Sequence, residues 1–308
     1  MVSDSTKTDP FTQLDNLIPL VSDLFAAIKQ KSDKSRSIMQ LILDRVILIA
    51  NARPDATLAA IHLSHQASPL KQPIYCAALA HMIGKQHEIK QDIQESLLHA
   101  ILTCNITFYE LQVLLNTIEG KLTDDQRTKM QKHALKGAQL VEAAGFMNPV
   151  MTKAMRQHHE RPDGSGYPNH LKGDDISTPA LIIGICETYT ARIDNRAYRK
   201  SIHPKEALSH LFKEDDPRIK KLMLNFAKAI GVYPPGTWVK LATGETAIVT
   251  QVQKTSPVPL VKALFDANDT PYMGAVARDC SAAESKVLGA TTPPCRPSVD
   301  LPVLFESF

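Results

Sequence analysis

The sequence lacks the long hydrophobic run that a membrane-spanning helix requires. Its longest aliphatic stretch, LILDRVILIA at 41–50, contains the charged pair Asp44-Arg45 and is shorter than the ~20 apolar residues that cross a bilayer. The first residues, MVSDSTKTDP, are polar and acidic, unlike the apolar segment of a signal peptide. These absences predict a soluble, cytoplasmic protein that does not bind a membrane.

Cysteine pairs are also missing. The cysteines are scattered, include no Cys-x-x-Cys motif, and fall in part within apolar helical stretches. Reduced thiols in a cytosolic protein are therefore expected, rather than a disulfide framework. The five cysteines are Cys76, Cys104, Cys186, Cys280 and Cys295.

The charge balance excludes a further class of partner. The net charge is only +3, and the sequence contains neither a basic run nor basic residues interleaved with aromatic ones. A nucleic-acid-binding surface normally shows one of these features, so no nucleic-acid partner is expected. With 44% hydrophobic and 22% charged residues the composition is that of a globular protein.

Helical periodicity is the main structural signal. From Phe11 to about Ile230 the apolar residues recur at helical spacing and strand signals are nearly absent. Thr123 and Gln126 form a capping-box pattern that marks the start of one helix. The candidate helices cover roughly 11–30, 35–51, 55–66, 73–88, 92–103, 106–118, 123–144, 149–159, 179–193, 204–213 and 217–230.

The pattern changes in the segment GVYPPGTWVKLATGETAIVTQVQ, 231–253. The Pro-Pro-Gly sequence ends the helical region, and the following residues alternate around a Thr-Gly turn, which predicts a β-hairpin. We therefore expect an N-terminal helical region at 1–55, a helical domain at 56–232 and a small β-rich extension at 233–308.

One loop indicates a functional site. The segment HHERPDGSGYPNHLKG, 158–173, begins with paired histidines and continues through several glycines and prolines. Long loops in compact domains are disproportionately functional, and paired histidines are candidate metal ligands.

The sequence of this loop resembles the HD-GYP family, whose members are bacterial phosphodiesterases that hydrolyse cyclic di-GMP. The similarity rests on HHERPDGSGYP followed by LKGDDIS and RAYRK, and on EGKLTDDQRTKMQKHALKGAQLV at 119–141. It covers about 68–230. It implies a mainly α fold of the HD superfamily, a helical bundle with a multi-metal centre, here with an N-terminal helical extension and a β-rich C-terminal appendix.

Several metal-ligand positions of the family are kept. The resemblance implies that His133, His158 and His159 are ligands, and that Glu187 stands where the family has an aspartate. Glutamate keeps the charge and reaches one methylene further. The alternatives are that His133 is a core histidine on an apolar helix face and that Glu187 is a salt-bridged carboxylate.

The His-Asp pair that names the family is replaced. The family's spacing, counted back from His133, places the pair on Cys104-Asn105. The segment HMIGK also resembles part of such a site, but His81 lies too far before His133, so we expect no role for it in metal binding. Cys104 remains a candidate ligand.

The residues that depart from the family pattern include positions expected to bind metal ions and positions expected to bind phosphate. Asparagine is neutral, so it cannot offset the repulsion between two dications ~3.5–4 Å apart. The remaining histidines leave two alternatives open: one transition metal (Fe, Mn or Zn), or no metal. The degenerate positions are Ser68, Gln72, Cys104, Asn105 and Phe108.

The nucleotide-binding positions are better kept. Arg196 and Arg199 match family positions that contact cyclic di-GMP, and guanidinium groups are planar, bidentate donors. Tyr167 can stack or donate a hydrogen bond. The alternative is that these residues only stabilise the loop. The motif itself is Gly166, Tyr167 and Pro168.

Together these features predict a degenerate HD-GYP protein that regulates cyclic di-GMP signalling, with phosphodiesterase activity lost or strongly reduced. Its partners would be cyclic di-GMP and another signalling protein bound through the GYP loop. One alternative is an active phosphodiesterase with an altered metal site. Another is an interaction domain without a ligand.

Overall fold

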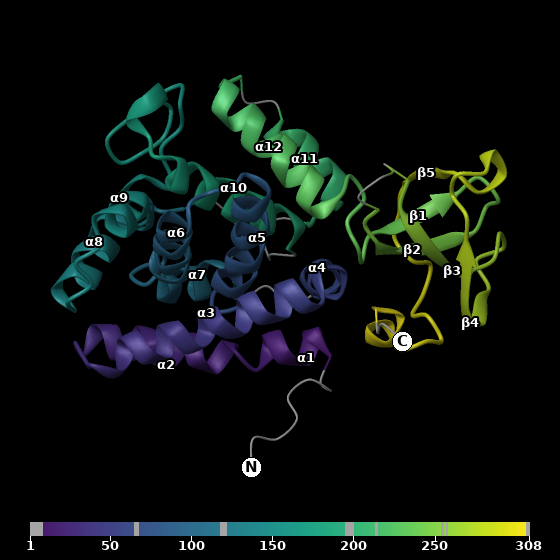
Figure 1. Ribbon diagram of the computed structural model, residues 1–308, viewed down its shortest axis with the longest axis horizontal. Helices are drawn as coiled ribbons and strands as arrows, with labels where there is room; N and C mark the ends of the chain where they lie inside the picture. The colour runs from purple at the N-terminus through teal and green to yellow at the C-terminus, as the bar shows by residue number, and fades with distance from the viewer. Residues whose placement is uncertain are drawn as a thin grey trace, which may run out of the picture.

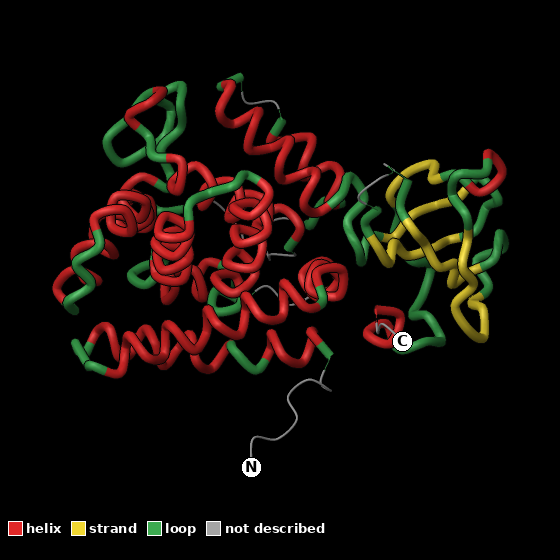
Figure 2. Tube along the Cα trace, in the orientation of Figure 1, coloured by secondary structure: helices red, strands yellow, loops and turns green. Residues whose placement is uncertain are grey.

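The computed structural model describes residues 9–64, 68–117, 122–194, 200–212, 215–253, 256 and 258–305. Within these ranges the helices lie at one end of the long axis and an antiparallel sheet lies at the other (Figures 1 and 2). The predicted mainly α fold with a small β-rich appendix is confirmed. In the described residues no helix combines the length and the apolar character needed to cross a membrane.

The elements follow one another in the order helices, then strands. The helices are α1 (Pro10–Asp15), α2 (Ile18–Lys29), α3 (Lys34–Ala52), α4 (Pro54–Leu63), α5 (Gln72–Gln86), α6 (Gln91–Thr103), α7 (Tyr109–Leu115), α8 (Asp124–Ala143), α9 (Pro149–Gln157), α10 (Thr178–Ile193), α11 (Pro204–Leu211) and α12 (Pro217–Ile230). The strands are β1 (Trp238–Leu241), β2 (Thr246–Gln251), β3 (Leu260–Phe265), β4 (Pro271–Arg278) and β5 (Val287–Ala290).

Helices α5 and α10 form the centre of the helical part. α5 is buried throughout 72–80 and α10 throughout 179–187. A helix that is apolar on every side needs neighbours on every side, and α3, α6, α10 and α12 pack around α5. Buried side chains of α2 and α3 belong to the same hydrophobic cluster. The division of the chain at 55/56 and 232/233 stays a prediction.

The observed starts of α8 and α2 can be compared with the starts predicted from the sequence. The Thr123 hydroxyl accepts from the Gln126 N–H and the Gln126 side chain accepts from the Thr123 N–H, which confirms the capping box at α8. The single helix predicted over 11–30 is wrong, because α1 and α2 are separate. Pro19 lies in the first turn of α2 and has no N–H to donate to the preceding turn.

The sheet has the strand order β4-β3-β2-β1-β5, and every neighbouring pair is antiparallel. The predicted hairpin is confirmed: β1 pairs with β2, with Trp238 opposite Ile248. Gly244 in the connecting turn has a φ of 84°, a conformation that glycine adopts without a steric penalty.

Helix α4 joins the sheet to the helical part. The His62 Nδ1–H donates to the Pro235 carbonyl at 2.9 Å, and the Tyr189 hydroxyl donates to His62 Nε2 at 2.8 Å. These bonds connect α4, the chain leading to β1, and α10. An apolar cluster reinforces the junction, with Ala56, Ala59 and Leu63 of α4 packed with Trp238, Ile248, Leu264, Phe265, Leu304 and Phe305.

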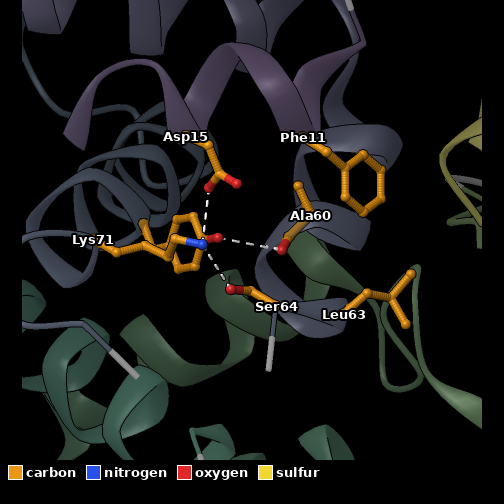
Figure 3. Close-up of a pocket in the computed structure, with 7 residues that line it drawn as sticks. Phe11, Asp15, Ala60, Leu63, Ser64 and Lys71 are labelled. Carbon is orange, nitrogen blue, oxygen red and sulfur yellow. Dashed lines mark hydrogen bonds and ion pairs between the residues drawn. The ribbon is translucent and has the colours of Figure 1, made fainter. Parts of the chain in front are cut away.

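Helix α1 covers a cavity of about 260 Å³ beside α4 and the start of α5 (Figure 3). Lys71 Nζ lies 2.8 Å from Asp15 Oδ1 and 3.0 Å from Ser64 Oγ. Because the Lys71 side chain is largely buried, these partners compensate its loss of solvation. The ion pair between Asp15 and Lys71 therefore links α1 to the segment that precedes α5.

Candidate metal centre

Four helices bring the candidate ligands together. His133 lies on α8, His158 and His159 directly follow α9, and Glu187 lies on α10. Cys104 ends α6. Helix α9 packs against α6, α8 and α10 (Figure 1). This packing brings the candidate ligand atoms close to one another.

The hydrogen bonds of two histidines fix their tautomers. The Nδ1–H of His133 donates to the Met130 carbonyl, and that of His158 donates to the Met155 carbonyl at 2.6 Å. A carbonyl oxygen only accepts, so Nδ1 carries the hydrogen and Nε2 carries a lone pair in each neutral ring. The two Nε2 atoms lie 3.2 Å apart. Two lone pairs therefore face each other across a space that suits a cation.

The histidines are held in their neutral, ligand-competent form. Burial lowers the pKa of His133 to about 4, with the charge of His158 adding to the effect, and burial likewise lowers the pKa of His158 to about 4. Burial also lowers the pKa of His159 well below its ordinary value. Only neutral imidazole can bind a metal, so all three rings are available at neutral pH.

Glu187 is the acidic member of the cluster. Its Oε2 lies 3.7 Å from His158 Nε2 and has no hydrogen-bond partner within the described part of the chain. Its Oε1 accepts from Asn105 Nδ2 and, at 3.5 Å, from Cys104 Sγ. Burial raises the pKa of this carboxyl group, and His133 and the Asn105 bond act in the opposite direction.

Two aromatic rings flank the histidines. The Phe108 ring stacks on His133 with centroids 4.9 Å apart, and the Tyr167 ring stacks on His159 at 4.7 Å. Phe108 therefore occupies one face of a candidate ligand. Tyr167 places the GYP loop directly against the cluster.

The residues present fit one metal ion. Ligand atoms of His133, His158 and His159 lie within 4.8 Å of one another, as do those of Cys104, His158 and Glu187. The first group offers three imidazole nitrogens, and the second offers one nitrogen, one oxygen and one sulfur. Both are donor sets of the kind that bind zinc and similar transition metals. Both groups need His158, whose single Nε2 lone pair can serve one ion.

A cavity of about 300 Å³ opens beside the cluster. Gln72, Asn105, Phe108 and Tyr167, all singled out from the sequence, contribute to its wall. The Gln112 amide donates to Gln72 Oε1 at 3.0 Å. The full lining is Gln72, Asn105, Phe108, Gln112, Met130, His159, Arg161, Tyr167, Gly184, Glu187, Thr188, Ala191 and Arg192.

Buried Glu160 shapes the GYP loop. Its carboxylate accepts from the backbone N–H groups of Asn169 at 2.7 Å and Leu171 at 3.0 Å. Gly166 has no room for a side chain, because a Cβ there would lie 2.3 Å from the Arg161 nitrogen. The Tyr167–Pro168 peptide bond is cis.

Other predicted positions lie elsewhere. Arg196 and Arg199 fall outside the described residues. Ser68 does not line the cavity; its carbonyl accepts from the Lys71 and Gln72 N–H groups at the start of α5. His81 Nε2 bonds to Asn51 Oδ1 of α3 at 3.1 Å, away from both ligand groups.

Sequence reasoning missed the two arginines in the cavity wall, Arg161 and Arg192. Arg161 Nη2 donates to the Thr188 hydroxyl at 3.4 Å, and Arg192 Nε is buried without a hydrogen-bond partner in the described structure. The only available signal was the position of Arg161 immediately after HHE. Nothing in the sequence around Arg192 distinguishes it from a solvated helix residue.

The HD domain family model matches residues 38–219. The chain belongs to the HD domain family. It is 31% identical over 149 residues to the cyclic di-GMP phosphodiesterase PA4108 of Pseudomonas aeruginosa, a match that covers 48% of this chain and 36% of the relative. It is 33% identical over 111 residues to the cyclic di-GMP phosphodiesterase response regulator RpfG of Xanthomonas campestris, covering 34% and 29%.

Further comparisons agree with the HD-GYP resemblance. The 3'3'-cGAMP-specific phosphodiesterase 1 of Vibrio cholerae is 29% identical over 140 residues, covering 46% of this chain and 27% of that protein. The matched region thus covers between 27% and 36% of the length of these three relatives. The structure of Bd1817, an HDG"Y"P protein from Bdellovibrio bacteriovorus, has a TM-score of 0.58 and 14% identity, with 73% of each chain covered. That likeness establishes the shared fold.

Proposed function

We propose that this chain is a degenerate HD-GYP protein that regulates cyclic di-GMP signalling and has lost most or all phosphodiesterase activity. The observation that carries the proposal is the Asn105 amide. The family's spacing places it where the resemblance implies the carboxylate that bridges two metals, and it donates a hydrogen bond to Glu187. A neutral donor there cannot hold two dications ~3.5–4 Å apart, as two-metal hydrolysis requires.

A second departure supports the same conclusion. The resemblance implies a lysine where this chain has Phe108. The Phe108 ring lies flat against His133 and contributes to the cavity wall. A phenyl ring has no charge with which to stabilise a phosphate oxygen. The site therefore lacks both a bridge between metals and one of the expected cationic groups.

Nucleotide binding is supported by the rest of the cavity wall. Arg161 and Arg192 supply guanidinium groups, which bind phosphate through paired hydrogen bonds. Tyr167 offers an aromatic edge and hydroxyl beside the histidines. The named relatives act on cyclic di-GMP or 3'3'-cGAMP, so cyclic di-GMP is the proposed ligand. The GYP loop, with its outer residues exposed, is the proposed contact for a signalling partner.

The second candidate is an active phosphodiesterase with one metal. The three converging histidines favour it, because one ion can still polarise a phosphoryl oxygen. It differs from the first candidate in a measurable way, since it requires turnover that depends on His133.

The test is incubation of the purified protein with cyclic di-GMP and Mn²⁺ or Fe²⁺, followed by product separation and calorimetric measurement of binding. We expect binding without turnover, or turnover slower by several orders of magnitude than in intact relatives, because metal activation supplies several kcal/mol and each ~1.36 kcal/mol is tenfold in rate. Rapid hydrolysis that disappears in His133→Ala would overturn the regulatory proposal.

A pair of variants tests the ligand site. Arg192→Ala should weaken binding of cyclic di-GMP by roughly 10- to 100-fold, the range for one hydrogen bond to a charged group. Arg156→Ala is the matched control, since Arg156 pairs with Glu142 and does not line the cavity. Equal affinity in both variants would contradict the proposed site.

A further inference from the structure

We propose that Cys104 and Asn105 position Glu187 instead of binding metal, and that Glu187 completes a single centre with His133, His158 and His159. The replaced His-Asp pair would then orient the fourth ligand. This inference rests on the proposed function, a degenerate HD-GYP site that holds at most one metal ion. It concerns the ligand set of that ion, which the assay of phosphodiesterase activity does not measure.

The two oxygens of Glu187 have different surroundings. Oε1 accepts from the Asn105 amide and from the Cys104 thiol. Oε2 is buried, accepts no hydrogen bond within the described residues, and lies 3.7 Å from His158 Nε2, the nitrogen that carries the lone pair. A buried carboxylate oxygen without a donor is costly. A cation beside His158 would satisfy it.

Asn105 is a donor in this arrangement and not a ligand. Its Nδ2 group faces Glu187 Oε1, and an amide NH2 has no lone pair available for a metal. The opposite orientation would place the amide oxygen against a carboxylate oxygen. The bond to Glu187 therefore fixes which end of the amide faces the carboxylate.

Cys104 gives weaker support to the same oxygen. Its Sγ lies 3.5 Å from Glu187 Oε1 and 3.5 Å from the Ile101 carbonyl. One S–H can donate to either acceptor, so Asn105 is the principal donor. The competing ligand group of Cys104, His158 and Glu187 would use the same His158 lone pair. The two groups therefore share one ion, and the proposed centre takes Glu187 from the second group but not the Cys104 thiol.

Glu187 is one methylene longer than the aspartate that the resemblance implies at this position. Glu187 is anchored on α10, and its longer side chain spans from the Asn105 amide to the edge of the histidine group. Four protein ligands complete the tetrahedral set of a structural zinc site, which keeps no open position for water. Such a centre would stabilise the fold around the cavity and would not activate water.

Cobalt(II) substitution separates the two ligand sets. The metal-free protein is loaded with Co²⁺, and its absorption spectrum and Kd are measured for wild type, Cys104→Ser and Cys104→Ala. We expect no sulfur-to-cobalt charge-transfer band in wild type. Cys104→Ser keeps a donor for Glu187 and should bind with near wild-type affinity, whereas Cys104→Ala should bind more weakly.

Asn105→Ala removes the principal donor and should weaken Co²⁺ binding by roughly 10- to 100-fold, as for other residues that orient metal ligands. Glu187→Gln should weaken it further and change the ligand-field spectrum. The thermal midpoint of the metal-free variants reports any separate folding defect. His81→Ala should leave affinity and spectrum unchanged.

The outcomes distinguish the inference from the proposed function. A charge-transfer band that disappears in Cys104→Ser would show a thiolate ligand and overturn the inference, while the one-metal site stands. Wild-type affinity in Asn105→Ala and Glu187→Gln would overturn it as well. Two tightly bound ions per chain, or none, would overturn both the inference and the proposed one-metal site.

Discussion

The Nε2 atoms of His133 and His158 lie 3.2 Å apart, and each ring donates its Nδ1 hydrogen to a backbone carbonyl. Neither Nε2 can therefore donate to the other in the neutral rings. Burial lowers the pKa of both imidazoles to about 4, so a proton does not fill the space between them at neutral pH. The arrangement suits a metal ion.

The first prediction concerns metal content. Protein purified without chelators should contain at most one tightly bound transition metal per chain, because the proposed alignment places the neutral Asn105 where a bridging carboxylate is needed. His158→Ala should lose the metal, since His158 belongs to both candidate ligand groups. Elemental analysis measures the ratio.

His81→Ala is the matched control for that measurement. His81 lies on α5 and bonds to Asn51 of α3, so its loss should leave the metal ratio unchanged. A fall in metal content equal to that of His158→Ala would show that the assignment of the replaced pair to Cys104-Asn105 is wrong.

The second prediction concerns restoration of the pair. Cys104→His combined with Asn105→Asp supplies an imidazole and a carboxylate beside Glu187, and should raise metal content above one ion per chain. Gln72 and Phe108 remain in the cavity wall and should keep turnover below that of intact relatives. Metal content and hydrolysis of cyclic di-GMP are measured on the same sample. An unchanged metal ratio would contradict the alignment.

Much of the fold was predictable because its signals are local. The capping box at Thr123 and the Thr-Gly turn of the hairpin each act within a few residues. The break between α1 and α2 was also local, but Pro19 is compatible with either a helix start or a kink until the packing is known.

The site was predictable only in part, because its chemistry depends on packing. The resemblance singled out Asn105 and Glu187, yet the bond between them requires the end of α6 to meet α10. The stacking of Phe108 on His133 and the place of Arg192 in the cavity wall have the same origin. Residues far apart in the sequence acquire these roles only when the helices assemble.

The third prediction concerns the GYP loop. In Gly166→Ala the new Cβ would lie 2.3 Å from the Arg161 nitrogen and 2.5 Å from the His159 oxygen, both backbone atoms that cannot move independently. Such overpacking typically costs about 1–3 kcal/mol. The loop should shift and carry Tyr167 away from His159, so we expect a lower free energy of unfolding and weaker metal binding.

Gly289→Ala in β5 is the control for Gly166→Ala, because a Cβ there would have nothing within 4 Å. Its stability should be unchanged or slightly higher, as expected when alanine replaces a glycine without strain. Chemical denaturation measures both variants. Equal stability of the two would contradict the close packing described for the loop.

The last prediction concerns pH and the junction between α4 and the sheet. Burial lowers the pKa of His62 from 6.5 to about 4, although its Nδ1–H bond to the Pro235 carbonyl acts in the opposite direction. Nε2 accepts from the Tyr189 hydroxyl only in the neutral ring. Between these pH values the unfolded state binds more protons than the folded state. The contribution of His62 to the free energy of unfolding is therefore fully present above about pH 6.5 and is lost as the pH falls toward 4.

The expected loss from His62 is about 2–3 kcal/mol over that interval, since one pKa unit corresponds to ~1.36 kcal/mol. Denaturant unfolding of the metal-free protein at several pH values measures it. His62→Gln cannot titrate in this range, so it should be less stable at pH 7 but lose less stability on acidification. The other buried histidines are present in both proteins, and the difference between the two curves isolates His62. Parallel curves would mean that His62 is protonated as readily in the folded protein as in the unfolded one.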